Sequence, residues 1–259
     1  MHFKSFGFSD VGKVRNRNED NYLCNEDDKL FLVADGMGGH VSGETASRIA
    51  IESIEEFVVK SRQKKIPWPI KARNDLTPEQ NRLIDAAIYG NRRIKQSARN
   101  NPALTGMGTT LVGGTIEDDN FAIVNVGDSR LYRIRDNEIK QITEDHSIVG
   151  EQKRSGIISE EEAKTHPQKH VLTSALGYIN ENPVIDTFLA EIEENDLYLI
   201  CSDGLYNMLE DNEILKIIKS IEDGSLYKMG LSLVLKANLS GGLDNITVVL
   251  LSFKKAEEI

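Results

Sequence analysis

Aspartates stand at the ends of several apolar, strand-like runs of this sequence. Asp35, Asp128 and Asp203 each follow such a run within two residues, and Asp244 precedes one. A single Asp-Gly pair is also a common turn signal, and for any one pair a turn is the simpler interpretation. If the strands are neighbours, however, their ends gather four carboxylates at one edge of a core. Carboxylates that lie so close together repel one another. One of them takes up a proton unless cations neutralise the charge.

Oxygen ligands of this kind indicate a hard divalent metal ion. Mg²⁺ and Mn²⁺ prefer carboxylate and carbonyl oxygens, whereas zinc recruits His or Cys. The sequence has no CxxC or HExxH motif, and its two cysteines, Cys24 and Cys201, are isolated from each other. A Mg²⁺ or Mn²⁺ site is therefore the leading inference from these residues.

A second cluster, residues 15–21, combines Arg15 with the carboxylate pair Glu19 and Asp20. Its composition alone favours a solvated, charged loop. Arginine also donates bidentate hydrogen bonds to phosphate oxygens, so Arg15 next to metal ions would make a phosphate-binding site. The sequence leaves both interpretations open.

The glycine-rich stretch of residues 36–43 precedes a helical pattern but does not match a nucleotide-binding loop. It lacks the Lys-Ser/Thr of a P-loop and the GxGxxG spacing. Its histidine, His40, is either a surface residue or, five residues beyond Asp35, a proton donor at the same site. The sequence also lacks a GxSxG elbow, a Cys with Arg six positions on, and any DxD pair. Of the known mechanisms for hydrolysing phosphate esters, direct attack by a metal-bound water is the one that remains.

The elements that must position these residues are predicted from periodicity. Buried strands are expected where short runs rich in Val, Ile and Leu occur, at Leu30–Ala34, Phe121–Val126, Leu197–Cys201 and Ile246–Phe253. Helices are expected at Ser42 to Arg62, from a capping box at Thr77 to about Arg99, after a capping box at Ser159, at Glu213–Ile221 with Asp211 as cap, and at Leu226–Asn238. Helical patterns are clustered rather than alternating with strands, which favours an α+β fold over a doubly wound sheet.

Composition excludes several classes of protein. The chain has 259 residues, with 31 Lys and Arg against 41 Asp and Glu, a net charge of −10. This balance excludes a broad basic surface for nucleic acid. The N-terminus lacks the apolar core of a signal peptide, and no apolar run approaches the roughly 20 residues of a membrane helix. Two cysteines form no disulfide framework. We therefore expect a cytoplasmic protein with neither a membrane nor a nucleic-acid partner.

Seven motifs, in order over almost the whole chain, resemble those of the metal-dependent protein serine/threonine phosphatases of type 2C (the PPM family) in their compact bacterial form. The motifs are SDVGKVRNRNEDN (9–21), LFLVADGMGGHVSGETAS (30–47), GMGTTLVGG (106–114), VGDSRLY (126–132), DHSIVGEQKRSGIISEEEAKTHPQKHVLTSALG (145–177), LICSDGLYNML (199–209) and GGLDNITVVLL (241–251).

This resemblance implies a fold and a domain organisation. The family fold is an αββα four-layer sandwich in which two antiparallel β-sheets are flanked by helices. Residues 1–259 would form a single catalytic domain of this type. Residues 145–175, approximately, would form a flap next to the active site.

The resemblance also implies roles for the metal-binding residues. Asp35 would bridge two Mg²⁺ or Mn²⁺ ions, and the backbone carbonyl of Gly36 would bind one of them. Asp203 and Asp244 would complete the protein ligands of the other ion. Asp128, together with Asp203, would hold a weaker third metal.

Four further residues receive roles in the same way. Glu19 and Asp20 would act largely through metal-bound waters. Arg15 would bind the substrate phosphate, and His40 would be the general acid that protonates the leaving alkoxide.

The implied activity is hydrolysis of phosphoserine and phosphothreonine by direct attack of a water that bridges two ions. A monomer acting on phosphorylated proteins, and reversing the signalling of a bacterial Ser/Thr kinase, is expected. Two alternatives stay open: a dedicated phosphatase for a single regulator of the anti-sigma-antagonist type, and a pseudophosphatase that only binds phosphoproteins. The flap departs from the common bacterial pattern at Lys169, His170 and Ser174, where two habitual arginines are replaced.

Overall fold

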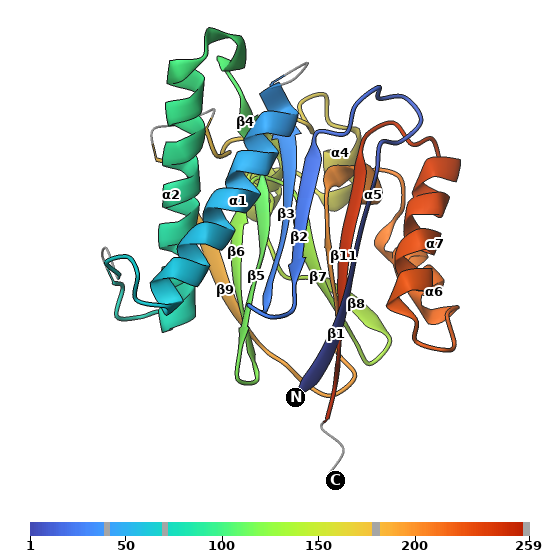
Figure 1. Ribbon diagram of the computed structural model, residues 1–259. Helices are drawn as coiled ribbons and strands as arrows, with labels where there is room; N and C mark the ends of the chain where they lie inside the picture. The colour runs from blue at the N-terminus through green and yellow to red at the C-terminus, as the bar shows by residue number, and fades with distance from the viewer. Residues whose placement is uncertain (39–41, 69–71, 178–181, 256–259) are drawn as a thin grey trace.

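The computed structural model describes residues 1–38, 42–68, 72–177 and 182–255. Within these ranges the strands form two sheets in which every pairing is antiparallel. Sheet A has the strand order β1-β11-β10-β7-β8, and sheet B has the order β2-β3-β5-β6-β9, with β4 paired to β3 (Figure 1). The strands of sheet A are β1 (His2–Asp10), β7 (Arg130–Arg135), β8 (Glu138–Gln141), β10 (Leu197–Cys201) and β11 (Ile246–Lys254). Those of sheet B are β2 (Asp20–Asn25), β3 (Leu30–Met37), β4 (Gly108–Thr109), β5 (Leu111–Glu117), β6 (Asn120–Val126) and β9 (Asp186–Glu191).

Helices cover the outer face of each sheet (Figure 1). On sheet B lie α1 (Ser42–Arg62) and α2 (Pro78–Asn100), and on sheet A lie α6 (Asp211–Lys219) and α7 (Leu226–Leu239). The expected αββα four-layer sandwich is therefore confirmed. Shorter helices connect the layers: η1 (Pro102–Leu104), α3 (Ile148–Arg154), α4 (Glu160–Thr165) and α5 (Asp203–Tyr206).

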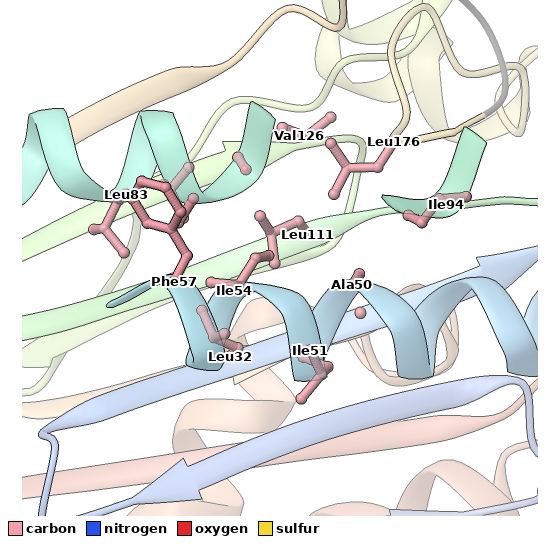
Figure 2. Packing of buried hydrophobic residues seen from close by; sticks show 14 of the residues in the cluster. Leu32, Ala50, Ile51, Ile54, Phe57, Leu83, Ile94, Leu111, Val126 and Leu176 are labelled. Atoms are coloured by element: carbon pink, nitrogen blue, oxygen red, sulfur yellow. The ribbon is translucent and has the colours of Figure 1, made fainter. Parts of the chain in front are cut away.

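Three apolar clusters fill the three spaces between the four layers. Ile54, Phe57 and Leu83 pack between α1, α2 and sheet B, where Figure 2 shows them against Leu32 and Leu111. A second cluster lies between sheet A and helices α5 to α7. The third lies between the two sheets. Burial of this apolar surface is the main force that holds the layers together.

Aromatic rings fix the spacing of the two sheets. The ring of Tyr198 in β10 meets Phe121 in β6 edge-on with centroids 5.2 Å apart, and Phe253 in β11 at 5.7 Å. Tyr198 is fully buried. Edge-to-face pairs of this kind add to the free energy gained by burial alone.

Local sequence explains where most of the helices begin. Thr77 caps α2 with a complete capping box: its Oγ1 accepts from the Gln80 N–H at 3.2 Å, and Gln80 Oε1 accepts from the Thr77 N–H at 3.1 Å. The capping box predicted at Ser159 is also present, and it begins α4. The cap predicted for α6 is wrong by one residue. Glu210 is the N-cap, and Asp211 is the first helical residue, where its charge favours the helix N-terminus.

The segment predicted as a flap leaves and rejoins the sandwich at one place. It contains α3 and α4, and no residue of α4 is buried. Ser147 and Leu172 form a β-bridge that joins its two legs. No helix within the described ranges has both the length and the apolar composition needed to cross a membrane.

Within the described residues, the chain passes between the two sheets more than once at one end of the sandwich. Residues 11–19 connect β1 of sheet A to β2 of sheet B, and residues 127–129 connect β6 of sheet B to β7 of sheet A. The start of α5 and the start of β11 lie at this same end, because Cys201 pairs with Val248 and Asp10 with Ile246. Segments distant in sequence therefore meet here.

Candidate metal centre and active site

Five aspartates meet at the end of the sandwich where the chain crosses between the sheets. Asp20 begins β2 and lies directly opposite Asp35 of β3 in the strand register. Asp128 lies in the β6–β7 crossing, Asp203 begins α5 after β10, and Asp244 precedes β11. The structure thus brings together the four aspartates whose strand ends were predicted to converge, together with Asp20.

The electrostatics of this cluster disfavour charge on its members. Burial raises the pKa of Asp35 well above its usual value, and repulsion from Asp20 and Asp203 raises it further. Burial likewise raises the pKa of Asp203, with Asp128 as the strongest of its charged neighbours. Burial also raises the pKa values of Asp20 and Asp128, each to about 6. At neutral pH, several carboxylates therefore share a site that favours a compensating cation.

Asp20 is held in place by two hydroxyl groups of sheet A. Its Oδ2 accepts from Ser202 Oγ at 2.7 Å and from Thr247 Oγ1 at 2.6 Å. Ser202 Oγ also accepts from the backbone N–H of Thr247 at 3.0 Å. Because Asp20 belongs to sheet B, these bonds tie the two sheets together at the site.

Asp203 has a carboxylate oxygen available to a ligand, whereas both oxygens of Asp244 accept hydrogen bonds. Asp203 Oδ2 accepts from Asn207 Nδ2 at 3.0 Å, whereas its Oδ1 is buried and has no hydrogen-bond partner within the described residues. Asp244 Oδ1 accepts from the Asn245 N–H at 2.8 Å, and its Oδ2 accepts from Arg15 Nη2 at 2.7 Å. An unpaired buried carboxylate oxygen is costly unless something binds it.

Two glycines allow the backbone segments at the site to approach closely. A Cβ on Gly36 would lie 2.2 Å from the Gly43 carbonyl oxygen, and a Cβ on Gly204 would lie 1.9 Å from the carbonyl oxygen of Asn245. Neither position has room for a side chain. Gly204 follows Asp203 and Asn245 follows Asp244, so this contact brings those two aspartates together.

The remaining predicted residues lie around this centre. The backbone N–H of Glu19 donates to Asn245 Oδ1 at 2.8 Å, and burial raises the pKa of the Glu19 carboxyl. Half of the Arg15 side chain is exposed. Gly36 lies in β3, where its N–H donates to the Glu19 carbonyl at 3.2 Å. His40 lies outside the described residues, so its role as a proton donor stays a prediction.

The donor set fits a hard divalent cation. Among the described residues, the converging aspartates offer oxygen ligands, and Asp203 Oδ1 needs a partner. Among the residues that the structure describes, no three His, Cys, Asp or Glu side chains are gathered closely enough to hold one ion as they stand. Arg15 occupies one oxygen of Asp244, but exposed ion pairs contribute only about 0–1 kcal/mol. Rotation of the Asp244 side chain away from Arg15 therefore costs little.

A hydrogen-bonded cluster next to Asp128 was missed by the sequence reasoning. The Arg130 guanidinium lies 3.7 Å from the ring centroid of Tyr206 and forms an ion pair with Asp145 at 2.7 Å. Tyr206 OH donates to the backbone carbonyl of Asp128 at 2.9 Å. All of these residues lie in the quoted motifs. The motif letters alone do not reveal that they touch one another.

Two residues at which the flap departs from the bacterial pattern line a polar cavity of about 390 Å³. Lys169 and His170 line this cavity together with Asp128 and Tyr206. Ser174 is instead buried, and its Oγ accepts from the Val184 N–H at 2.9 Å. Lys169 and His170 therefore face the surroundings of Asp128, whereas Ser174 anchors the end of the flap.

Comparison with known proteins shows similarity over most of the chain. The family description "Protein phosphatase 2C" matches residues 13–228. The "Serine/threonine phosphatase stp" of Listeria welshimeri is 38% identical over 250 residues, covering 93% of this chain and 92% of its own. "Protein phosphatase PhpP" of Streptococcus pneumoniae is 34% identical over 253 residues, covering 96% and 97%.

Solved structures show the same similarity. The Mycobacterium tuberculosis serine/threonine phosphatase PstP/Ppp superposes with a TM-score of 0.83 at 32% identity, covering 98% of this chain and 99% of its own. The catalytic domain of PstP in complex with two manganese ions superposes with a TM-score of 0.80 at 32% identity, covering 98% and 99%. From its sequence, its fold and its converging aspartates alike, this chain belongs to the protein phosphatase 2C family.

Proposed function

We propose that this chain hydrolyses phosphoserine and phosphothreonine in proteins with the help of a pair of Mg²⁺ or Mn²⁺ ions. The observation that carries the proposal is the convergence of aspartates that cannot all be charged without a cation, one of which has a buried oxygen with no partner among the described residues. The relatives named above are Ser/Thr phosphatases, and the PstP structure contains two manganese ions.

We assign the metal-binding roles to residues whose positions are set by backbone contacts. Thr110 holds the backbone of Asp35 by two hydrogen bonds. The Asp35 N–H donates to Thr110 Oγ1 at 2.9 Å, and the Asp35 carbonyl accepts from the Thr110 N–H at 2.9 Å. We assign Asp35 to both ions, the Gly36 carbonyl to one of them, and Asp203 and Asp244 to the other. When bound, the ions supply an activated water and compensate the charge of the phosphate.

We assign Asp128, Glu19 and Asp20 to weaker or indirect metal contacts because of where they lie. Asp128 lies close enough to Asp203 to raise its pKa, which suits a third ion held by the two together. Glu19 and Asp20 already use their backbone or side-chain atoms in protein hydrogen bonds, so we assign them to metal-bound water.

We assign Arg15 to the binding of the substrate phosphate. Its guanidinium is half exposed and already contacts a carboxylate of the centre, Asp244. A phosphate dianion offers the same planar group two acceptor oxygens. Arg15 therefore exchanges one anion for another when substrate binds, and it offsets charge on the equatorial oxygens in the transition state. His40 is proposed, from the family resemblance alone, as the proton donor to the leaving oxygen.

The proposed partners are phosphorylated proteins and the Ser/Thr kinase that modifies them. We propose a monomer that acts in the cytoplasm, and the two free cysteines suit a reducing compartment. The family assignment supports neither a single-regulator phosphatase nor a pseudophosphatase. The acidic composition likewise favours no nucleic-acid partner.

Metal removal tests the proposed function. After EDTA treatment and buffer exchange, hydrolysis of an aryl phosphate and of a phosphothreonine peptide should fall by roughly 10³-fold or more, because nucleophile activation and charge compensation are both lost. Mn²⁺ should restore both activities. Turnover that persists in EDTA would contradict the metal assignment, and phosphopeptide binding without turnover in Mn²⁺ would identify a pseudophosphatase.

A further inference from the structure

His146 is a buried histidine at the base of the flap that none of the roles above uses. Only 3% of its surface is exposed. Its backbone N–H donates to the carbonyl of Gly127 at 2.9 Å, and its ring Nδ1 accepts from the N–H of Gly127 at 3.2 Å. His146 therefore holds Gly127 from both sides, and Gly127 directly precedes Asp128.

The other ring nitrogen of His146 fixes the orientation of the ring. Since Nδ1 accepts a hydrogen bond, the proton of the neutral ring is on Nε2. His146 Nε2 then donates to Asp186 Oδ2, which lies 2.9 Å away. This bond is the main cause of the lowered pKa of the Asp186 carboxyl. A carboxylate behind a histidine is a common way to set which tautomer the ring adopts.

Gly127 has a conformation that needs such support. Its φ is +104°, and a Cβ there would lie 2.7 Å from Thr110 Cγ2. The chain turns here from sheet B to sheet A, so the direction of the next residue depends on this peptide. On the far side, the carbonyl of Asp128 is fixed by Tyr206 OH at 2.9 Å.

The same histidine also contacts the returning leg of the flap. The carbonyl of His146 accepts from the N–H of Thr173 at 2.9 Å. Both legs of the flap thus meet at the residue that holds Gly127. The His146 ring is thus one of several contacts that fix the backbone next to Asp128, and it is the one that accepts from the Gly127 N–H.

We propose that His146 is a positioning residue: through Nδ1 it fixes the Gly127 peptide and so sets the position of Asp128, the next residue. The inference rests on the proposed function only in assigning Asp128 to a metal ion. The proposed role of His146 differs from a purely structural one because it depends on one ring nitrogen, Nδ1. If the role were purely structural, the contact of Nε2 with Asp186 would matter as much as the contact of Nδ1 with Gly127.

Two substitutions separate the contributions of the two nitrogens. In His146→Asn the side-chain amide oxygen takes the place of Nδ1 and still accepts from Gly127. In His146→Gln the amide reaches the place of Nε2 and Asp186 but leaves the Gly127 N–H unpaired. Each variant loses one ring contact, so the melting temperature in EDTA should fall by a similar amount in both.

Mn²⁺ binding, followed by the EPR signal of free Mn²⁺, should distinguish them. We expect the weakest Mn²⁺ step to be about 10–100-fold weaker in His146→Gln than in His146→Asn, as is typical when a residue that orients a metal ligand is lost. Equal affinities, or weaker binding in His146→Asn, would overturn the proposal. If the wild type itself binds no Mn²⁺, it is the proposed function that fails.

A measurement on the unmodified protein covers the case in which neither variant folds. The ¹⁵N chemical shifts of the His146 ring should show a proton on Nε2 and an unprotonated Nδ1. A proton on Nδ1 would overturn the proposal, since that nitrogen could then not accept from Gly127.

Discussion

Asp35→Asn and Asp203→Asn are expected to abolish phosphatase activity and at the same time to raise the melting temperature of the metal-free protein. Loss of activity follows because each side chain is a proposed metal ligand, and we expect kcat to fall by roughly 10³-fold or more even with excess Mn²⁺. The gain in stability follows from the repulsion within the cluster. Asn has nearly the same shape but carries no charge.

The sign of the stability change comes from the pKa shifts. Both carboxyls have a folded pKa above the unfolded value of about 3.9. The folded state therefore binds protons more tightly, and its stability falls as the pH rises from the unfolded pKa through the folded one. Above that range the cost is present in full, and Asn removes it. A gain of about 0.5–2 kcal/mol is expected, as for other functional residues held at a cost to stability.

The measurement is calorimetric melting in EDTA at pH 8, together with phosphopeptide hydrolysis in Mn²⁺. Asp118→Asn makes the same chemical change in an exposed turn with positive φ, which Asn tolerates, and should alter neither property. Normal activity in Asp35→Asn or Asp203→Asn, or melting below the wild type in EDTA, would contradict this account of the cluster.

Gly204→Ala is expected to damage both stability and activity. A Cβ at this position would lie 1.9 Å from the Asn245 carbonyl oxygen, so the backbone that follows Asp203 must move away from the backbone that follows Asp244. Overpacking against backbone typically costs about 1–3 kcal/mol. Since the two aspartates are proposed ligands of one ion, we also expect kcat to fall by about 100-fold, because small displacements of catalytic groups have effects of this size.

Gly90→Ala is the matched control for this prediction. Gly90 lies within α2, and the nearest atom to a Cβ there is Ile54 Cγ1 at an ordinary 3.5 Å. Alanine should therefore be tolerated, and its higher helix propensity favours a small gain in stability. Unfolding in denaturant and steady-state kinetics with Mn²⁺ check both variants. A Gly204→Ala protein with the stability and kcat of the wild type would show that close approach of these segments is not required.

The sequence predicted the interior strands better than the edges of the sheets. Leu197–Cys201 was predicted with its correct bounds because β10 is buried along its whole length and reads as a continuous apolar run. By contrast, β1 is an edge strand in which no residue is classed as fully buried, and its mixed composition gave no clear signal. The short strand β8 lies at the opposite edge and was missed for the same reason.

The site was predictable to the extent that chemistry follows from residue type. The strand-end aspartates were found because four of them recur beside apolar runs, and because the motifs that contain them occur in the order of a known family. The contacts that hold them were not predictable. His146 bonds to residues 19 and 40 positions away, and Thr247 bonds to Asp20 across 227 positions. Local patterns contain no information about such distant polar pairs.

Anomalous diffraction from crystals soaked in Mn²⁺, recorded at the manganese edge, tests the central claim most directly. We expect two strong peaks on either side of the Asp35 carboxylate, one of them also in contact with Asp203 and Asp244, with Asp244 turned away from Arg15. Peaks confined to other acidic parts of the surface, with none between these aspartates, would contradict this claim.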